Sequence, residues 1–255
     1  MRVKVHSHGI LHFGLHRQVD DTLHTMALGV EQRYTATVID TALKSNVFEE
    51  PDANKEEMYN LGIIHMRKRI RDYYTKMTRA NPQYKLSRID KLTVGMLGDL
   101  EKHKPCLKAK GGETSDLTCF CVDLAKEFRH TSENMKMLHR SGEALLALKT
   151  TFETNHRRID SQTFTKSFDD VKRMVIYYKL AGGHLVPKFH RVLHLVGRML
   201  YHGNPKYYGT WQDESENGMV KNQAVMTHAL RFVEGVFERQ MVREAIDSRM
   251  YKSKL

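Results

Sequence analysis

Apolar side chains recur every three or four positions along most of the chain, which is the period of an amphipathic helix with one buried face. The clearest example lies at residues 61–77, where one stripe contains Ile63, Met66, Ile70, Tyr73 and Met77. Similar stripes occur at residues 117–128, 138–152, 164–178 and 189–200. Each segment predicts a helix that faces a core, and a last helix is expected over residues 214–247.

Glycine and proline interrupt these periodic runs and predict where the helices end. The interruptions are Asn81-Pro82, Lys104-Pro105, Gly111-Gly112, Gly182-Gly183 and Gly203-Asn204-Pro205. Alternation typical of strands is confined to residues 2–5 and 10–13. The pattern therefore predicts a mainly α protein, in which an N-terminal region and a C-terminal quarter flank a helical middle over residues 50–184.

The chain is strongly basic, with 41 lysines and arginines against 30 acidic residues and a net charge of +11. The excess lies in two blocks, residues 55–110 and residues 157–255. In the first block, Arg67, Lys68 and Arg71 fall outside the apolar stripe of the predicted helix. Such a surface favours a polyanion as the partner over another protein or an acidic metabolite.

A second basic segment precedes the Gly111-Gly112 break and includes Lys108 and Lys110. Free backbone N–H groups at a helix start, together with these ammonium groups, would suit the phosphate of a nucleic acid. A solvated basic loop is the alternative. The spacing of a P-loop is missing, so the sequence predicts no nucleotide cofactor and no ATP or GTP hydrolysis.

Cysteine content and hydropathy indicate the cellular compartment in which the protein is expected. Cys106, Cys119 and Cys121 are too few for a disulfide framework, and C-x-C differs from the C-x-x-C of zinc ribbons. They are typical of reduced thiols in the cytosol or nucleus. No apolar run approaches the length of a membrane span, and the histidine-rich N-terminus lacks a signal-peptide pattern, so neither membrane insertion nor secretion is expected.

Asp21 and His24 form a D-x-x-H pattern that can carry chemistry. If a helix begins at Asp21, its carboxylate could bind Mg²⁺ while His24, one turn further on, steadies it or the substrate. The alternative interpretation is that Asp21 caps the helix and His24 lies on its surface.

Further candidates lie near the C-terminus. His190 and His194 have the i, i+4 spacing of a zinc-binding helix, but Arg191 stands where a metalloprotease needs glutamate, so that activity is disfavoured. The acidic group Asp213, Glu214 and Glu216 beside Trp211 suits either a helix start or a metal. Five histidines at positions 6, 8, 12, 16 and 24 could bind a transition metal.

Three groups of segments, taken in order, resemble eukaryotic DDE transposase-like proteins of the CACTA and hAT-like kind, over about residues 20–222. They are Asp21-Thr-Leu-His24 with Leu28-Gly29-Val30; Lys108-Ala-Lys-Gly-Gly-Glu-Thr114; and Pro187-Lys-Phe-His190 with Gly203-Asn-Pro205 and Thr210-Trp-Gln-Asp-Glu214. Many such relatives are transposon-derived sequences.

The resemblance implies an RNase H-like α/β core interrupted by a large helical insertion. Residues 1–50 would form part of that core, residues 51–184 the basic insertion, and residues 185–255 the C-terminal helical part of the core. Asp21 and His24 match the D-x-x-H motif, and Glu214 matches the late catalytic glutamate, with Glu216 as the alternative. Asp21 and Glu214 would then hold Mg²⁺ in an active enzyme.

One departure changes the expected function. The family places its first catalytic aspartate well upstream of D-x-x-H, whereas here no acidic residue precedes Asp20. Two-metal phosphoryl transfer needs the complete carboxylate set. We therefore expect a chain truncated at its N-terminus, or a degenerate copy that keeps nucleic-acid binding and has lost cutting.

Three functions follow from these observations. The first is a nuclear, transposase-derived protein that binds DNA through Arg67, Lys68, Arg71, Lys108 and Lys110. The second is an active Mg²⁺-dependent nuclease or strand-transfer enzyme that uses Asp21 and Glu214. The third is a helical scaffold that binds another protein. The sequence leaves the oligomeric state open, a homo-oligomer included.

Overall fold

The computed structural model describes residues 20–45, 55–100, 102, 104–210 and 241. By its internal contacts the chain divides into two compact units, Met1–Gly209 and Thr210–Leu255, and the elements below belong to the first. They are η1 (Leu23–Glu31, a π-helix), α2 (Gln32–Lys44), α3 (Lys55–Ala80), η2 (Val94–Leu97), β1 (Gly98–Asp99), β2 (Lys104–Pro105), α4 (Gly111–Glu127), α5 (Glu133–Thr154), α6 (Ser161–Leu180), α7 (Pro187–Gly197), α8 (Met199–His202) and η3 (Pro205–Tyr208).

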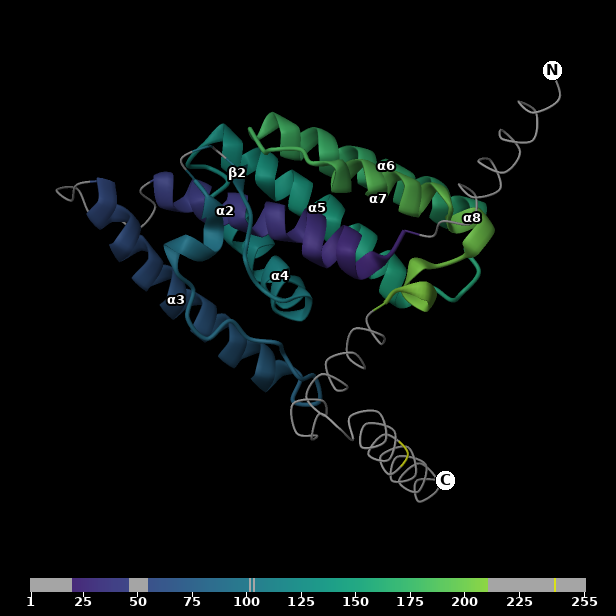
Figure 1. The fold of residues 1–255 in the computed structure, drawn as a ribbon, viewed down its shortest axis with the longest axis horizontal. Helices are drawn as coiled ribbons and strands as arrows, with labels where there is room; N and C mark the ends of the chain where they lie inside the picture. Colours follow the sequence, from purple (N-terminus) through teal and green to yellow (C-terminus); the bar gives the residue numbers. More distant parts are fainter. Residues whose placement is uncertain (1–19, 46–54, 101, 103, 211–240, 242–255) are drawn as a thin grey trace, which may run out of the picture. The chain divides into compact units, whose positions relative to one another are not determined.

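A single continuous helix, formed by η1 and α2, lies at the centre of this unit (Figure 1). It packs against α4, α5 and α7, and its C-terminal half also contacts α3. Helices α5 and α6 pack along each other, and α6 packs on α7. The core is therefore the shared interior of these helices rather than a sheet.

The apolar period of the sequence did not predict helix α2. Its sequence, QRYTATVIDTALK, is rich in β-branched residues, which lose side-chain freedom in a helix and are typical of strands. Burial outweighs this preference, because Val38 and Ile39 are completely buried and Tyr34 is 1% exposed. The Thr37 hydroxyl donates to the Arg33 carbonyl oxygen at 2.7 Å, so that polar side chain is also satisfied within the helix.

The structure confirms the helices that the apolar periods predicted. Residues 61–77 fall inside α3, and residues 117–128, 138–152 and 164–178 fall in α4, α5 and α6 or within one residue of their ends. Two details differ. The segment 189–200 is divided at Arg198 between α7 and α8. Helix α4 begins at Gly111, so the Gly111-Gly112 break lies in its first turn, and the Glu113 carboxylate accepts the Lys110 N–H at 2.9 Å.

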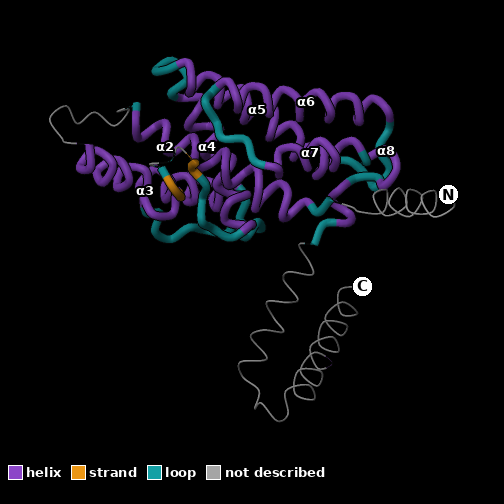
Figure 2. The backbone as a smooth tube through the Cα atoms, turned by 45° about the horizontal axis from the view of Figure 1, so that its top comes forward, coloured by secondary structure: helices purple, strands orange, loops and turns teal. Residues whose placement is uncertain are grey.

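The mainly α fold class is confirmed (Figure 2). Across the described ranges, the sheet is limited to β1 and β2, which pair antiparallel with Gly98 opposite Pro105 and Asp99 opposite Lys104. This pair lies inside the segment expected to be the helical insertion. The strands expected at 2–5 and 10–13 lie outside the described residues, as does nearly all of the helix expected over 214–247.

None of the described helices is both long enough and apolar enough to cross a membrane.

Candidate nucleic-acid interface

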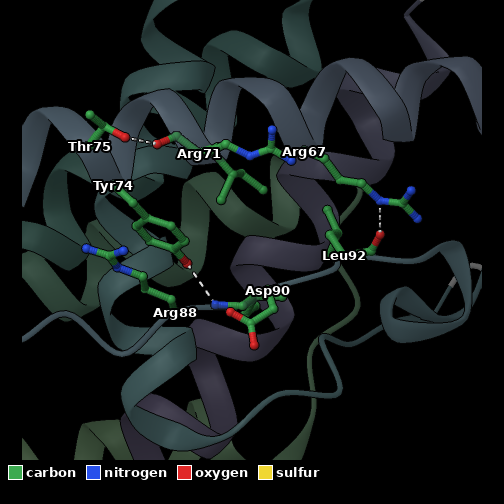
Figure 3. A pocket seen from close by; sticks show the side chains of 9 residues that line it. Arg67, Arg71, Tyr74, Thr75, Arg88, Asp90 and Leu92 are labelled. Atoms are coloured by element: carbon green, nitrogen blue, oxygen red, sulfur yellow. Dashed lines mark hydrogen bonds between the residues drawn. The ribbon is translucent and has the colours of Figure 1, made fainter.

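A basic cleft lies between α3 and the segment that follows it. After α3 ends at Ala80, the chain runs back along the helix, and a cavity of about 170 Å³ forms between the two. We call it the α3 cleft, and its lining residues are Arg67, Ile70, Arg71, Tyr74, Thr75, Arg88, Ile89, Asp90 and Leu92. Figure 3 shows the α3 side chains on one side of the cleft and those of residues 88–92 on the other.

Apolar anchors and two hydrogen bonds fix the walls of the α3 cleft. Ile70, Ile89 and Leu92 are 3%, 8% and 1% exposed, so the returning segment is packed onto the helix. Arg67 Nε donates to the Leu92 carbonyl oxygen at 2.6 Å, and the Ile89 N–H donates to the Tyr74 hydroxyl oxygen at 3.3 Å. The cleft is therefore preformed, since α3 side chains hold the backbone of the returning segment in place.

Three arginines and one carboxylate, that of Asp90, line this cleft. Arg88 donates through Nη2 to the Thr78 hydroxyl at 2.8 Å and lies 6.0 Å from the centre of the Tyr74 ring. A guanidinium carries five N–H donors. Arg67 and Arg88 therefore retain donors after these contacts, and Arg71 is exposed at the cleft. The arrangement suits a ligand with several anionic oxygens.

The other basic residues named from the sequence lie near this cleft or on neighbouring backbone. Lys68 is exposed on α3 beside Arg67. Lys108 and Lys110 are exposed on the segment between β2 and α4, where the Lys108 N–H donates to the Met96 carbonyl oxygen at 2.7 Å. Met96 lies in η2, four residues after the cleft residue Leu92, so the lysine segment is bonded to the chain that leaves the cleft.

Arg88 is the cleft residue that sequence reasoning missed. It lies between helices, in a segment with no apolar period, so nothing in the local pattern marked it. Only the return of the chain along α3 places it opposite Arg71. Arg69, one residue from Lys68, has a different role, because it pairs with Glu127 and lies 5.3 Å from the centre of the Phe128 ring.

Asp21 and His24 are in contact, in the geometry of a helix cap. The Asp21 carboxylate accepts the His24 N–H at 2.9 Å and the Leu23 N–H at 3.3 Å, and its Oδ2 lies 2.5 Å from His24 Nδ1. These bonds satisfy backbone donors that a helix start leaves open, which matches the capping interpretation. Next to it, Asp20 accepts from Arg198 at 3.2 Å.

The Mg²⁺ site stays a prediction. Within the described ranges, no three histidine, cysteine, aspartate or glutamate side chains group to hold a metal ion. Asp213, Glu214 and Glu216 lie outside those ranges, so the structure does not place them relative to Asp21.

Two motifs from the resemblance meet where η1 packs on α7. The Lys188 ammonium donates to the Leu28 carbonyl oxygen, and burial lowers the pKa of Lys188. Gly29 permits this approach, because a Cβ there would lie 2.7 Å from Lys188 Cδ and 3.0 Å from the His24 carbonyl oxygen. Leu28-Gly29-Val30 and Pro187-Lys-Phe therefore serve helix packing in this fold, whereas His190 is exposed.

Gly203-Asn204-Pro205 fastens the C-terminal turn onto the end of α5. Asn204 is completely buried, and its Nδ2 donates to the carbonyl oxygens of Phe152 at 2.8 Å and Asn155 at 2.9 Å. Gly203 has φ +81°, and a Cβ on it would lie 2.2 Å from the Arg157 carbonyl oxygen. Both residue types are therefore required by local geometry.

A buried ion pair, which no sequence motif marks, lies at the junction of η1 and α2. Lys149 Nζ donates to Glu31 Oε2 at 2.9 Å and to Ser115 Oγ at 2.7 Å, and the Thr118 hydroxyl also donates to Glu31 at 3.1 Å. Glu31 is 2% exposed. Burial acts to lower the pKa of Lys149, but the Glu31 carboxylate, together with Cys119 and Glu153, more than offsets it, so the net pKa is raised. We call the contacts Asp20–Arg198, Leu28–Lys188 and Glu31–Lys149 the η1 seam.

Comparisons of this chain with protein-family models, with curated proteins and with solved structures find no match.

Proposed function

We propose that this protein binds nucleic acid, with DNA as the partner, by holding backbone phosphates at the α3 cleft. The observation that carries the proposal is that Arg67, Arg71 and Arg88 line one preformed cleft in which Asp90 is the single lining carboxylate. Arginine binds phosphate through paired N–H donors, and phosphate contacts supply most of the affinity in sequence-independent binding.

The surrounding charge supports an extended contact rather than a single bound anion. Lys68 is exposed on α3 one residue after Arg67, and Lys108 and Lys110 are exposed on the segment bonded to Met96. A nucleic-acid backbone presents a phosphate every few ångströms, so one strand can contact several of these groups at once. The net charge of +11 would also speed association.

We propose a transposase-derived origin on the sequence resemblance, with the basic helical region around α3 as the insertion. The α/β core that this origin requires would have to include the N-terminal segments outside the described residues. Cutting is not part of the proposal, because the carboxylate of Asp21 is already engaged by the backbone of its own helix.

A binding titration tests the proposal. Fluorescence anisotropy of a labelled duplex of about 25 base pairs, a length chosen to exceed any single-cleft footprint, would be measured at low and at moderate salt, with and without Mg²⁺. The products would be examined on a denaturing gel. We expect salt-sensitive binding and intact DNA. Nicking that depends on Mg²⁺ and is lost in Asp21→Asn would favour the nuclease instead, and no binding at low salt would overturn the proposal.

Two double variants test whether the α3 cleft is the surface that binds DNA. Arg71→Gln/Arg88→Gln removes two exposed cleft charges, and Lys166→Gln/Lys179→Gln removes the same charge from exposed positions on α6. The cleft variant should weaken binding by about tenfold or more at moderate salt, because two phosphate contacts are lost. The α6 variant should bind within about twofold of the unmodified chain. Equal losses in both would show that overall charge, not the cleft, determines affinity.

A further inference from the structure

The exposed face of α7 carries two histidines that the proposed function does not use. Helix α7 begins with Pro187 and buries Phe189, Val192, Leu195 and Val196. His190 and His194, one turn apart, fall on the opposite face and are both exposed. Neither ring is therefore needed for packing of the core.

The two imidazoles converge. His190 Nε2 and His194 Nε2 are 2.8 Å apart, and the rings meet edge to face at 87° with their centres 4.4 Å apart. Such a contact requires one nitrogen to carry a proton and the other to present its lone pair. The pair thus holds at most one proton between the two nitrogens.

We infer that His190 and His194 form a two-nitrogen chelating site for a divalent transition-metal ion, of the Cu²⁺ or Ni²⁺ kind. If an ion lay about 2.0–2.1 Å from each nitrogen, the usual distance to imidazole, the N–metal–N angle would be about 85°. That angle is close to the right angle between neighbouring ligands in square-planar or octahedral coordination, which Cu²⁺ and Ni²⁺ favour, and is smaller than the tetrahedral angle of structural zinc sites.

The charged residues around the two histidines determine how well the site would bind a cation. The ammonium of Lys188 is directed to the Leu28 carbonyl oxygen and Arg198 pairs with Asp20, so both of these charges are engaged elsewhere. Arg191 is exposed beside His190 and lowers the affinity for a cation. Water would fill the remaining coordination positions. For the ion to bind both Nε2 atoms, the proton that one Nε2 carries in this contact has to move to Nδ1 of the same ring or to solvent.

Isothermal titration of the full chain with NiCl₂ tests this inference. The N-terminal histidines supply other sites, so the comparison is one of site number between variants. His190→Ala and His194→Ala should each lose one site that the unmodified chain has. The double variant should lose no more than either single one, because chelation requires both rings. His156→Ala, which removes an exposed histidine elsewhere, should keep the site.

Thermal unfolding supplies a second readout. Ni²⁺ should raise the melting temperature of the unmodified chain more than that of the double variant, since the chelate exists only while α7 is helical. Without metal, all the variants should melt together, because the rings are exposed. An unchanged number of Ni²⁺ sites and an unchanged Ni²⁺-dependent rise in the double variant would overturn the inference, and so would loss of the site on removal of only one of the two rings.

Discussion

The η1 seam and the α3 cleft are both rich in charged side chains, but they use them differently. In the η1 seam, Glu31 is paired with Lys149 in the interior, and Lys188 is bound to a backbone carbonyl of the neighbouring helix. In the α3 cleft, arginines keep donors exposed to solvent. The motifs that stood out in the sequence lie along the first region, and isolated basic residues make up the second. Polar residues in a motif-like order can therefore serve folding, and a basic cleft can form from residues that no motif marks.

The largest effect is expected at the buried ion pair of the η1 seam. Glu31→Gln should lower the free energy of unfolding by about 3–5 kcal/mol, because it leaves the Lys149 ammonium buried without its counter-ion. The double variant Glu31→Met/Lys149→Met should recover most of that loss. Urea unfolding followed by circular dichroism measures both. A cost below about 1 kcal/mol for the single variant would mean that the pair is solvated.

Asn204→Ala should give the next largest loss of stability. It leaves the buried carbonyl oxygen of Phe152 without the amide donor, at about 1–3 kcal/mol, while the carbonyl oxygen of Asn155, whose bond is only part-buried, can be hydrated instead. Asn134→Ala, on the exposed surface of α5, is the matched control and should change the unfolding free energy by less than about 0.5 kcal/mol. If the two variants had similar unfolding free energies, the explanation that Asn204 holds the Gly-Asn-Pro turn on α5 would be wrong.

Two substitutions at Asp21 test whether its carboxylate acts as a helix cap or as a catalytic group. Asparagine caps a helix about as well as aspartate, whereas alanine does not. Asp21→Ala should therefore lower the unfolding free energy by about 1 kcal/mol, and Asp21→Asn should cost clearly less. Chemical denaturation of the two variants in parallel makes the comparison. If alanine and asparagine behaved alike, the capping interpretation of D-x-x-H would be wrong.

A smaller effect is expected at Asp170 on α6, a buried carboxylate outside both regions. Its Oδ2 has no hydrogen-bond partner among the described residues, and Arg173 lies 3.4 Å from Oδ1. Burial raises the pKa of Asp170, and Arg173 only partly opposes this. The folded chain therefore binds this proton more tightly than the unfolded chain, so the contribution of Asp170 to stability falls as pH rises through its raised pKa.

The pH dependence can be isolated with Asp170→Asn, which does not titrate. At neutral pH this variant should be more stable than the unmodified chain. The difference should shrink as pH falls below the raised pKa, where Asp170 is protonated. Unfolding free energies at several values between pH 3 and pH 7, which span the ordinary carboxyl range, test this. A difference that grows on acidification would contradict the sign.

The sequence predicted the helices whose apolar period is regular and failed where burial is not periodic. The stripe at 61–77 located α3 because one face of that helix is solvated. Helix α2 is buried on most sides, so its apolar residues do not alternate with polar ones, and its threonines and valine resemble a strand. Tertiary packing, which no local pattern contains, decided its conformation.

The candidate site was also predictable only in part. Arg67 and Arg71 share a face of α3, and their spacing was sufficient to group them. Arg88 joins them because Ile89 and Leu92 pack onto that helix, and Glu31 meets Lys149 across more than a hundred residues of chain. Both depend on long-range contacts. The D-x-x-H spacing did predict the contact of Asp21 with His24, but spacing alone could not tell a cap from a metal ligand.

The most direct test of the central claim is the slope of DNA affinity against salt concentration, measured for Arg71→Gln/Arg88→Gln and for the charge-preserving Arg71→Lys/Arg88→Lys. Each phosphate contact contributes about 0.9 to the slope of log K against log salt. If the α3 cleft holds the backbone, the glutamine variant should have a slope smaller by about 2 and the lysine variant should keep the original slope. A glutamine variant with an unchanged slope would contradict phosphate binding at this cleft.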